Sequence, residues 1–398
     1  MKITDIETYA VGAGWKNWLF VRVITDEDLY GIGEATLNGF ALTCEAAVQE
    51  LKSLVIGLDP REIRRNIRMM MERVSNDGGH IHHAAVAGIE EACWDILGKS
   101  LGVPVYQLLG GKVRDWVDCY ANGWYRTERS PQAFATLARE VMSRGFKALK
   151  FDPLGTTNGF FGPSDLEISL EIIRAVREAV GPGVRLLIDL HARLSESEAV
   201  VFIAKCGDLD IFWWEEPTTR EREAPTNSVA ARVTDRIASG ESFASVGQFL
   251  TLMQGKSVSI YQPEPMSLGG IVPTIAVAEI AGADGAWIAP HQSGGPVATA
   301  VCLQLAAILP NFLIQEHFDP FNDPWTSSLV TWTPQLDPMT GRLEIPSAPG
   351  LGLDLNLETV AAHPYDPRAF LDVTTNGWEK RLGQSADIEI NTLGAKNE

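Results

Sequence analysis

The segment RLLIDL (185–190) decides the fold, because apolar runs of the same kind recur along the chain, each with a polar residue at or near its end. The next two runs are IFWWE (211–215) and RIASGE (236–241), and 26 residues separate each closing acid from the next. Short buried strands separated by helix-length segments are typical of βα units that build a parallel sheet. The spacing therefore predicts a repeating βα architecture.

The repeat extends in both directions from this segment. Eight runs are found in all: VDCYANGW (117–124), KALKFD (147–152), RLLIDL, IFWWE, RIASGE, SVSIYQPE (257–264), AWIAPH (286–291) and FLIQE (312–316). Eight parallel strands close a barrel, and polar groups at their ends meet around one mouth. The residues that end the last six runs are candidates for this ring: Asp189, Glu215, Glu241, Glu264, His291 and Glu316.

Three regions are predicted from the patterns along the chain. Residues 1–115 combine alternating, strand-like segments with stretches of helical spacing, which indicates an α+β domain. Residues 116–340 hold the barrel, of the modified (β/α)7-8 type within the α/β class. Residues 341–398 begin with GRLEIPSAPGLGLDLN (341–356), which we expect to return to the first domain as a strand and a turn.

Three shorter segments carry expectations of their own. The Gly- and Pro-rich stretch 153–165 is expected to form a loop over the mouth. The HIHH run (80–83) is expected to lie in a loop, and its adjacent histidines suit a chelate poorly. The polar tail 383–398 is expected to be disordered.

Composition excludes some classes of partner. The 398 residues carry a net charge of −18, which argues against nucleic acid or an anionic membrane surface as a partner. The five cysteines are scattered without a CxxC pair, as expected in a reducing compartment. The N-terminal sequence lacks a signal-peptide profile, and no apolar run reaches the roughly 18 residues of a membrane span. We therefore expect a cytoplasmic protein without a membrane partner.

Three of the strand-end acids form a candidate metal site. Asp189, Glu215 and Glu241 stand at matched positions of successive strands, so their carboxylates converge. Three like charges so close together would repel one another without a cation between them. Oxygen-only ligands suit a hard divalent ion, and Mg²⁺ keeps open positions for substrate oxygens.

Two histidines lie next to these acids. His291 follows Glu264 by one βα unit, and a carboxylate beside an imidazole fixes its tautomer and raises its basicity. His191 lies two residues after Asp189, on the same side of an extended chain. It could serve as a fourth ligand, an acid–base catalyst or a structural donor.

The chain resembles the enolase superfamily in its mandelate racemase subgroup. The resemblance rests on GIGEATLNG (31–39), AVAGIEEACWDILGK (85–99), WWEEP (213–217), QPEPMSLGGI (262–271) and APHQSGGP (289–296), and covers nearly the whole chain. It implies a capping domain built from both chain ends over the barrel. It also implies Mg²⁺ on the three acids and abstraction of a proton α to a carboxylate, with a homo-oligomeric assembly, an octamer or a dimer.

The chain departs from the subgroup where a second base would stand. It has Lys150-Phe151-Asp152 in place of a Lys-x-Lys pair, and Glu264 in place of an aspartate beside His291. Its Asp189-x-His191 spacing resembles the sugar-acid dehydratases. Asp152 is a poor base, whereas a dehydratase requires one base and one acid.

The resemblance therefore implies dehydration of a gluconate-, galactonate- or arabinonate-like acid to a 2-keto-3-deoxy acid through an ene-diolate. His291 is expected to remove the C2 proton and His191 to protonate the C3 hydroxyl, while Lys150 stabilises the ene-diolate charge. Glu316 is expected to hydrogen-bond the substrate carboxylate, which requires a proton on Glu316. Candidate substrate-binding residues are Asn38, Asp152 and Trp124, with Trp15 and Trp18 beside them.

Two alternatives remain open. A racemase, epimerase or cycloisomerase would use the same scaffold on a carboxylate substrate. A non-catalytic relative is disfavoured by the complete set of acids and histidines.

Overall fold

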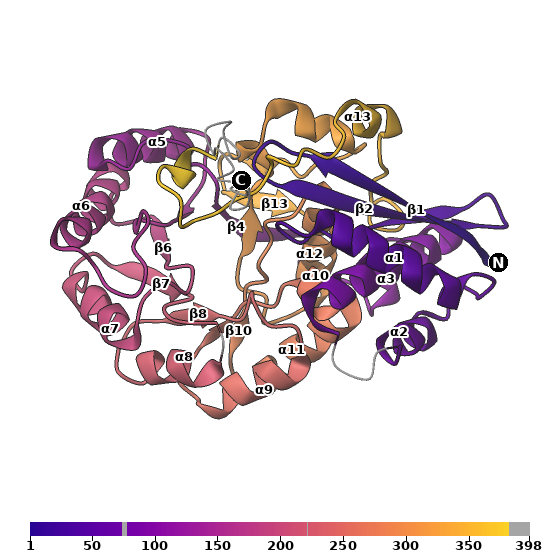
Figure 1. Cartoon of the computed structure of the whole chain (residues 1–398), viewed down its shortest axis with the longest axis horizontal. Coiled ribbons are helices and arrows are strands. Elements are labelled where there is room, and N and C mark those ends of the chain that lie inside the picture. Colours follow the sequence, from indigo (N-terminus) through magenta and orange to yellow (C-terminus); the bar gives the residue numbers. More distant parts are fainter. Residues whose placement is uncertain (74–77, 221, 382–398) are drawn as a thin grey trace, which may run out of the picture.

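The computed structural model describes residues 1–73, 78–220 and 222–381. Its N-terminal part is an antiparallel sheet of three strands in the order β1-β2-β3, with helices packed on one face (Figure 1). The elements are β1 (Ile3–Gly12), β2 (Asn17–Thr25), β3 (Tyr30–Glu34), α1 (Ala41–Val55), α2 (Ile63–Met71), α3 (Gly79–Leu101) and α4 (Val105–Leu108).

Strand β2 is buried on both faces because alternate side chains serve two cores. Leu19, Val21 and Val23 pack against the helices of the N-terminal part. Trp18 and Phe20 belong to the main core, which continues into the rest of the molecule. The sheet is thus held between its own helices and the barrel.

The barrel consists of eight parallel strands in the described chain. They are β4 (Trp116–Ala121), β5 (Ala148–Phe151), β6 (Arg185–Asp189), β7 (Ile211–Glu215), β8 (Ile237–Ser239), β9 (Ile260–Tyr261), β10 (Trp287–Ile288) and β11 (Gln315–His317). Neighbours pair in chain order from β4 to β10, β11 pairs with β4, and a parallel bridge between Ile288 of β10 and Phe312 before β11 closes the ring. The predicted fold class is therefore confirmed.

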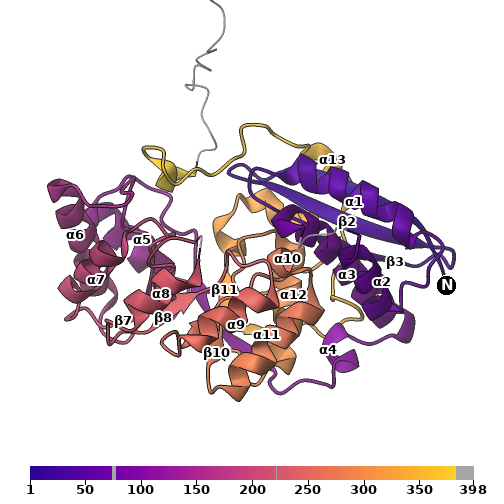
Figure 2. The same ribbon diagram turned by 60° about the horizontal axis from the view of Figure 1, so that its bottom comes forward.

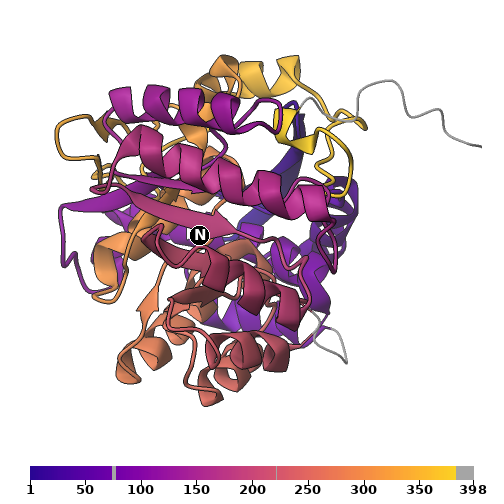
Figure 3. The ribbon, with the colours of Figure 1, turned by 90° about the vertical axis from the view of Figure 1, so that its left-hand side faces the viewer.

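Helices alternate with the strands and lie outside them, as Figures 1 and 3 show. They are α5 (Pro131–Ser143), α6 (Pro163–Val180), α7 (Glu196–Lys205), α8 (Glu223–Ala230), α9 (Val246–Gln254), α10 (Pro265–Leu268), α11 (Ile271–Ala283) and α12 (Pro296–Ile308). Serine starts three of them: the side chains of Ser130, Ser195 and Ser245 each accept a hydrogen bond from a backbone N–H in the first turn.

The barrel interior explains where the polar residues lie. Each strand contributes one apolar side chain to a closed inner cluster: Tyr120, Ala148, Leu187, Trp213, Ala238, Ile260, Ala289 and Ile314. Two residues further along each strand, the side chain again points into the barrel, one level closer to the mouth. This level is occupied by Asn122, Lys150, Asp189, Glu215, Gln262, His291 and Glu316. In the β8 unit this position is Gly240, whose φ of +122° bends the chain, so that Glu241 reaches the mouth instead.

The chain after β11 runs back over both parts. Its elements are η1 (Asp319–Phe321), η2 (Pro324–Leu329), β12 (Leu336–Asp337), β13 (Arg342–Glu344), α13 (Leu357–Ala362) and η3 (Trp378–Lys380). Strand β13 pairs antiparallel with β4, and Asn17 in β2 then exchanges hydrogen bonds with Asp366. Figures 1 and 2 show the yellow segment after α13 crossing from the N-terminal sheet to the barrel.

One local prediction was wrong. The HIHH run lies in the first turns of α3, where His82 and His83 are buried, because the apolar helical face begins earlier than the histidines suggest. Residues 41–73 form the two helices α1 and α2, with Gly57 and Pro60 between them. The tail 383–398 lies outside the described residues. Within the described ranges, no helix is both long and apolar enough to cross a membrane.

Candidate active site

A cavity of about 920 Å³ lies at the barrel mouth under the N-terminal sheet. Its floor carries Lys150, Asp189, His191, Glu241 and His291 from the barrel strands. Trp15, Lys16, Asn38 and His80 line it from the N-terminal part, and Trp378 and Arg381 from the C-terminal segment. The expected loop 153–165 does not contribute to the lining. Its Gly155 carbonyl instead accepts a hydrogen bond from Trp378 Nε1.

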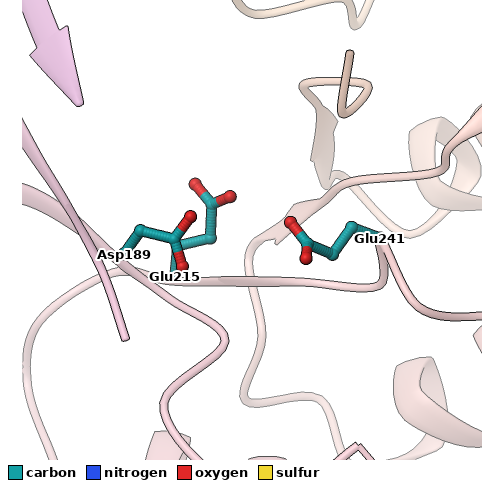
Figure 4. Close-up of side chains that lie close together, drawn as sticks. All are labelled: Asp189, Glu215 and Glu241. Carbon is teal, nitrogen blue, oxygen red and sulfur yellow. The ribbon is translucent and has the colours of Figure 1, made fainter. Parts of the chain in front are cut away.

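The side chains of Asp189, Glu215 and Glu241 lie close together (Figure 4), and Asp189 and Glu241 line the cavity. One carboxylate oxygen of each lies within 4.8 Å of the other two. Oε2 of Glu241 is buried without a hydrogen-bond partner among the described residues. Three converging carboxylates, two of them buried and the third half-buried, and a bare oxygen are the donor set that a hard divalent cation requires, so these residues fit the magnesium implied by the sequence.

Lys150 lies beside the triad and is completely buried. Its Nζ lies 2.6 Å from Glu215 Oε1 and 2.8 Å from Glu316 Oε1. Burial lowers the pKa of Lys150, but Glu215 and Glu316 outweigh burial and hold it well above its usual range. Burial raises the pKa of Glu215, with Lys150 acting in the opposite direction. The ammonium therefore stays charged at the centre of the mouth.

His291 is oriented by Glu264. Its Nδ1 lies 2.7 Å from Glu264 Oε2, which leaves Nε2 facing the cavity, 3.5 Å from Glu241 Oε2. Burial lowers the pKa of His291, yet Glu241, Glu316 and Glu264 together raise it to about 10. A cation bound at the triad would neutralise Glu241 and lower this pKa toward the range in which the imidazole acts as a base.

His191 is oriented in the same way from the opposite side of the triad. Its Nδ1 lies 2.5 Å from Asp152 Oδ2, and its Nε2 lies 3.6 Å from Asp189 Oδ2. Asp152 is fully buried and also pairs with Arg193. Burial raises the pKa of Asp152, but Arg193 and His191 lower it overall, so the carboxylate is ionised.

The backbone at these strand ends is held in uncommon conformations. His191, Ala192 and Glu216 have φ values of 45°, 57° and 41°. Their geometry is supported locally, since the Ala192 N–H donates to the Glu216 carbonyl and Glu216 Oε1 accepts from Ser239 and Gly240. Such conformations concentrate at functional sites.

Four predicted residues lie elsewhere than expected. Asp152 faces His191 and Arg193 rather than the cavity. Trp124 packs in the core and donates from Nε1 to the Lys150 carbonyl, and Trp18 lies outside the cavity lining. Glu316 accepts hydrogen bonds from Lys150, Asn122 and the Gln292 backbone, and although burial raises its pKa, Lys150 lowers it below the usual value. Glu316 thus lacks the proton expected for contact with a substrate carboxylate.

Other residues of the site were not found from the sequence. Arg220 donates to Glu241 at 2.9 Å, Arg193 pairs with Asp152, and Asn122 donates to Glu316 at 2.7 Å. Asn122 could have been found, because it occupies the polar level of the first barrel strand. Arg381 could not, since its place in the cavity depends on a chain segment far from the barrel in sequence.

Comparisons with known proteins agree with this geometry. The family model described as the mandelate racemase / muconate lactonizing enzyme N-terminal domain matches residues 8–110, and the enolase C-terminal domain-like model matches residues 133–360. A D-xylonate dehydratase of Haloferax volcanii is 33% identical over 383 residues, covering 93% of this chain and 91% of the relative. A D-galactonate dehydratase of Pectobacterium atrosepticum is 32% identical over 363 residues, covering 90% and 94%.

The fold is shared with a crystal structure described as a mandelate racemase/muconate lactonizing enzyme from Jannaschia sp. CCS1. The two superpose with a TM-score of 0.85 at 30% sequence identity, over 92% of this chain and 98% of that one. The chain therefore belongs to the mandelate racemase and muconate lactonizing enzyme family of the enolase superfamily.

Proposed function

We propose that this protein is a hydro-lyase that dehydrates a sugar acid, of the gluconate, galactonate or arabinonate kind, to a 2-keto-3-deoxy acid with the help of Mg²⁺. The named dehydratases among its relatives support sugar-acid dehydration in general. One observation carries the proposal for this chain. Two imidazoles present Nε2 from opposite sides of the carboxylate triad, and each is oriented by its own carboxylate through Nδ1.

His291 is the proposed base. With Nδ1 held by Glu264, its Nε2 can accept the proton from C2 of the substrate. The electrons of the broken C–H bond move into the substrate carboxylate and form an ene-diolate. Lys150 is the cation of the floor that can face this growing charge, and Glu316 keeps its ammonium in place.

His191 is the proposed acid. Its Nε2 donates a proton to the C3 hydroxyl while the C3–O bond breaks, so that water leaves and the ene-diolate electrons form the C2=C3 double bond. The resulting enol takes up a proton at C3, loses the proton of its C2 hydroxyl and becomes the 2-keto acid. Asp152 stabilises the protonated imidazole before transfer, and Arg193 keeps Asp152 ionised.

Asp189, Glu215 and Glu241 would hold the Mg²⁺ ion. When bound, such an ion supplies positive charge that stabilises an anion forming on a substrate carboxylate. We also propose that the protein is a homo-oligomer and that it works in the cytoplasm. Its five cysteines are buried free thiols, which favours a reducing compartment.

A second candidate is epimerisation or racemisation at C2. The two oriented imidazoles could serve as bases on the two faces of the substrate, in the manner of a two-base racemase. In that case the C2 proton would be exchanged and the configuration inverted without loss of water.

The test is a direct assay of the purified protein. A panel of aldonic acids should give 2-keto-3-deoxy products with Mg²⁺, activity should disappear after chelation by EDTA and return with Mg²⁺, and calorimetry should detect one Mg²⁺ site. Glu241→Gln should weaken that binding, because the ligand loses its charge. If wild-type protein binds Mg²⁺ and inverts C2 without forming a keto acid, epimerisation replaces dehydration. Absence of Mg²⁺ binding would contradict the metal assignment.

A further inference from the structure

Two cations of the cavity are not used by the proposed chemistry. Lys16 and Arg381 both line it, and each is only 5% exposed. Among the described residues, neither has a carboxylate within ion-pair distance; the ion pairs of the cavity involve Lys150, Arg220 and the histidines instead. A buried cation without an anion is costly, so its presence in a cavity points to a ligand.

Arg381 enters from the C-terminal segment and is surrounded by aromatic rings. Its guanidinium carbon lies 4.6 Å from the ring centre of Phe318 and 5.1 Å from those of Trp15 and Tyr125. Nε and Nη1 are buried without a hydrogen-bond partner in the described chain. Stacking on these rings fixes the plane of the guanidinium at the cavity wall, with Nη1 against Gly123.

Lys16 approaches the same place from the N-terminal part. Its Nζ lies 4.6 Å from the centre of the Trp15 ring and donates to the carbonyl and the hydroxyl of Ser293. An ammonium has three donors, so one remains for a ligand. Burial lowers the pKa of Lys16 to about 8 and also lowers that of Arg381, as expected for cations whose desolvation neighbouring carboxylates do not fully offset.

The two cations lie across the mouth from the metal triad. Tyr125 follows β4 and Phe318 follows β11, and these two strands pair with each other. The triad is carried by β6 and β7 and by the residue that follows the turn after β8, on the other side of the ring. A substrate that reaches the triad with one end can therefore present its other end to Lys16 and Arg381.

The nearby acids offset the charge of this pair only in part: Glu264, Glu34 and Glu316 raise the pKa of Lys16, but none of them forms an ion pair with it. Glu241 is paired with Arg220, and Glu264 with His291. Asp372 accepts hydrogen bonds from Thr374 within its own turn. Among residues 1–73, 78–220 and 222–381, no carboxylate forms an ion pair with Lys16 or Arg381, and a ligand could supply the missing negative charge.

We propose that Lys16 and Arg381 bind a second carboxylate at the far end of the substrate, so that the preferred substrates are sugar diacids rather than aldonic acids. The inference rests on the proposed dehydration and revises its substrate class, since it places the diacids ahead of the aldonic acids named there. A guanidinium and an ammonium that share one aromatic wall match a carboxylate, whereas the terminal CH₂OH of an aldonic acid would leave both cations without an anion.

The test compares matched acids that differ in the terminal group alone: gluconate with glucarate, and galactonate with galactarate. In the wild type, kcat/KM should be at least roughly tenfold higher for a diacid than for its aldonic partner. Arg381→Gln should reduce this ratio by roughly ten- to a hundredfold, mainly through a higher KM for the diacid, and Arg381→Lys should restore part of it. Arg126→Gln is the matched control: Arg126 lies near Arg381 but pairs with Asp323 and does not line the cavity, so the ratio should stay unchanged.

The outcomes separate the two proposals. Turnover of aldonic acids with equal or higher kcat/KM than the diacids would overturn the inference and leave the proposed dehydration intact. An equal loss for both acids in Arg381→Gln would also overturn it, since that pattern indicates a structural role. If neither class is dehydrated, the proposed function itself fails. The wild-type ratio decides the question even if Arg381→Gln folds poorly.

Discussion

His191 and His291 differ in their surroundings although both are oriented through Nδ1. The partner of His291 is Glu264, at the next strand end, and its Nε2 lies near Glu241. The partner of His191 is Asp152, which Arg193 holds ionised from behind, and its Nε2 lies near Asp189. Asp152 and Arg193 thus fix the His191 ring through Nδ1 and leave Nε2 on the side of the metal triad.

The two histidine variants should therefore fail at different steps. His291→Asn should lower both turnover and exchange of the C2 proton with solvent deuterium by roughly 10²–10⁴-fold, because the base is lost. His191→Asn should lower water loss by a similar factor while C2 exchange continues, because that proton transfer uses the other imidazole. Nuclear magnetic resonance in D₂O measures exchange, and a keto-acid assay measures water loss.

His363→Asn, which lies outside the cavity and stacks on Trp325, is the control. Dehydration by His191→Asn at the wild-type rate would exclude His191 as the acid. C2 exchange by His291→Asn at the wild-type rate would exclude His291 as the base. In a two-base epimerase, each variant would instead keep C2 exchange with one of the two C2 epimers, the one from which the remaining imidazole removes the proton.

At the level of elements, two carboxylates of the N-terminal part join it to the barrel, because each binds backbone N–H groups at the start of a barrel helix. Glu34 at the end of β3 accepts hydrogen bonds from the backbone N–H groups of Gly295 and Ala298, at the start of α12. Glu90 of α3 accepts from those of Ile271 and Val272, at the start of α11. These N–H groups have no partner within their own helix, so a carboxylate satisfies them and complements the helix dipole. Gly295, which donates to Glu34, lies four residues after His291 in the chain.

Glu34 predicts a pH-dependent contribution to stability. Burial raises its pKa from about 4.5 to about 7, although the hydrogen bonds from Thr36, Gly295 and Ala298 act in the opposite direction. Since the folded state holds the proton more tightly, this contribution is complete below pH 4.5 and is lost as the pH rises through 7. Glu34→Gln removes the titration, so the free energy of unfolding of the wild type should fall relative to the variant by up to roughly 3 kcal/mol between pH 4.5 and 8.

Urea unfolding of both proteins across this pH range measures the difference. Thr8→Ala, on the sheet but away from Glu34, should run parallel to the wild type and serves as the control. Parallel curves for Glu34→Gln and the wild type would show that Glu34 is ionised in the folded protein throughout the range.

At the level of the whole molecule, the cavity is closed by parts of the chain far apart in sequence. The barrel provides the floor, residues 15–16 and 36–40 approach from the N-terminal part, and residues 370–381 pass over from the C-terminal segment (Figure 2). Trp378 lies in this last stretch. Its ring centre is 5.7 Å from that of His191, and its Nε1 donates to the Gly155 carbonyl. The metal triad needs none of these covering residues.

Removal of the cover should therefore separate metal binding from substrate binding. A chain ending at Leu371 loses Trp378 and Arg381 but keeps β13, α13 and the contacts of Asn17 with Asp366 and Ala369. We expect it to fold and to bind Mg²⁺ with wild-type affinity, while KM for the sugar acid rises roughly tenfold or more because the cavity is open to water. Circular dichroism, calorimetry and steady-state kinetics measure the three properties.

Trp378→Phe keeps an aromatic ring in the cover and should lie between the wild type and the shortened chain. Unchanged KM in the shortened chain would show that the C-terminal segment takes no part in substrate binding. Loss of Mg²⁺ binding would show that the segment supports the barrel itself.

The sequence by itself determined the barrel, the order of its strands and the residues at the strand ends. The physical reason is that these features are local. A strand alternates with period two, so Leu187 and Asp189, or Trp213 and Glu215, must point inward at successive levels once the apolar one is buried. The pairing of Glu264 with His291 follows from neighbouring strands of one closed sheet.

Only the tertiary structure decided what each polar group faces. Asp152 was expected to reach the substrate, but Arg193 and His191 converge on it, and a buried carboxylate takes the cations nearest to it. The sequence placed Trp124 near the cavity, yet the neighbouring Tyr125 lines it. Arg381 belongs to no strand or repeat, and it reaches the barrel mouth because the chain returns over the N-terminal sheet through contacts such as that of Asn17 with Asp366. Contacts between residues hundreds of positions apart have no periodic signature, and they set the far end of the cavity.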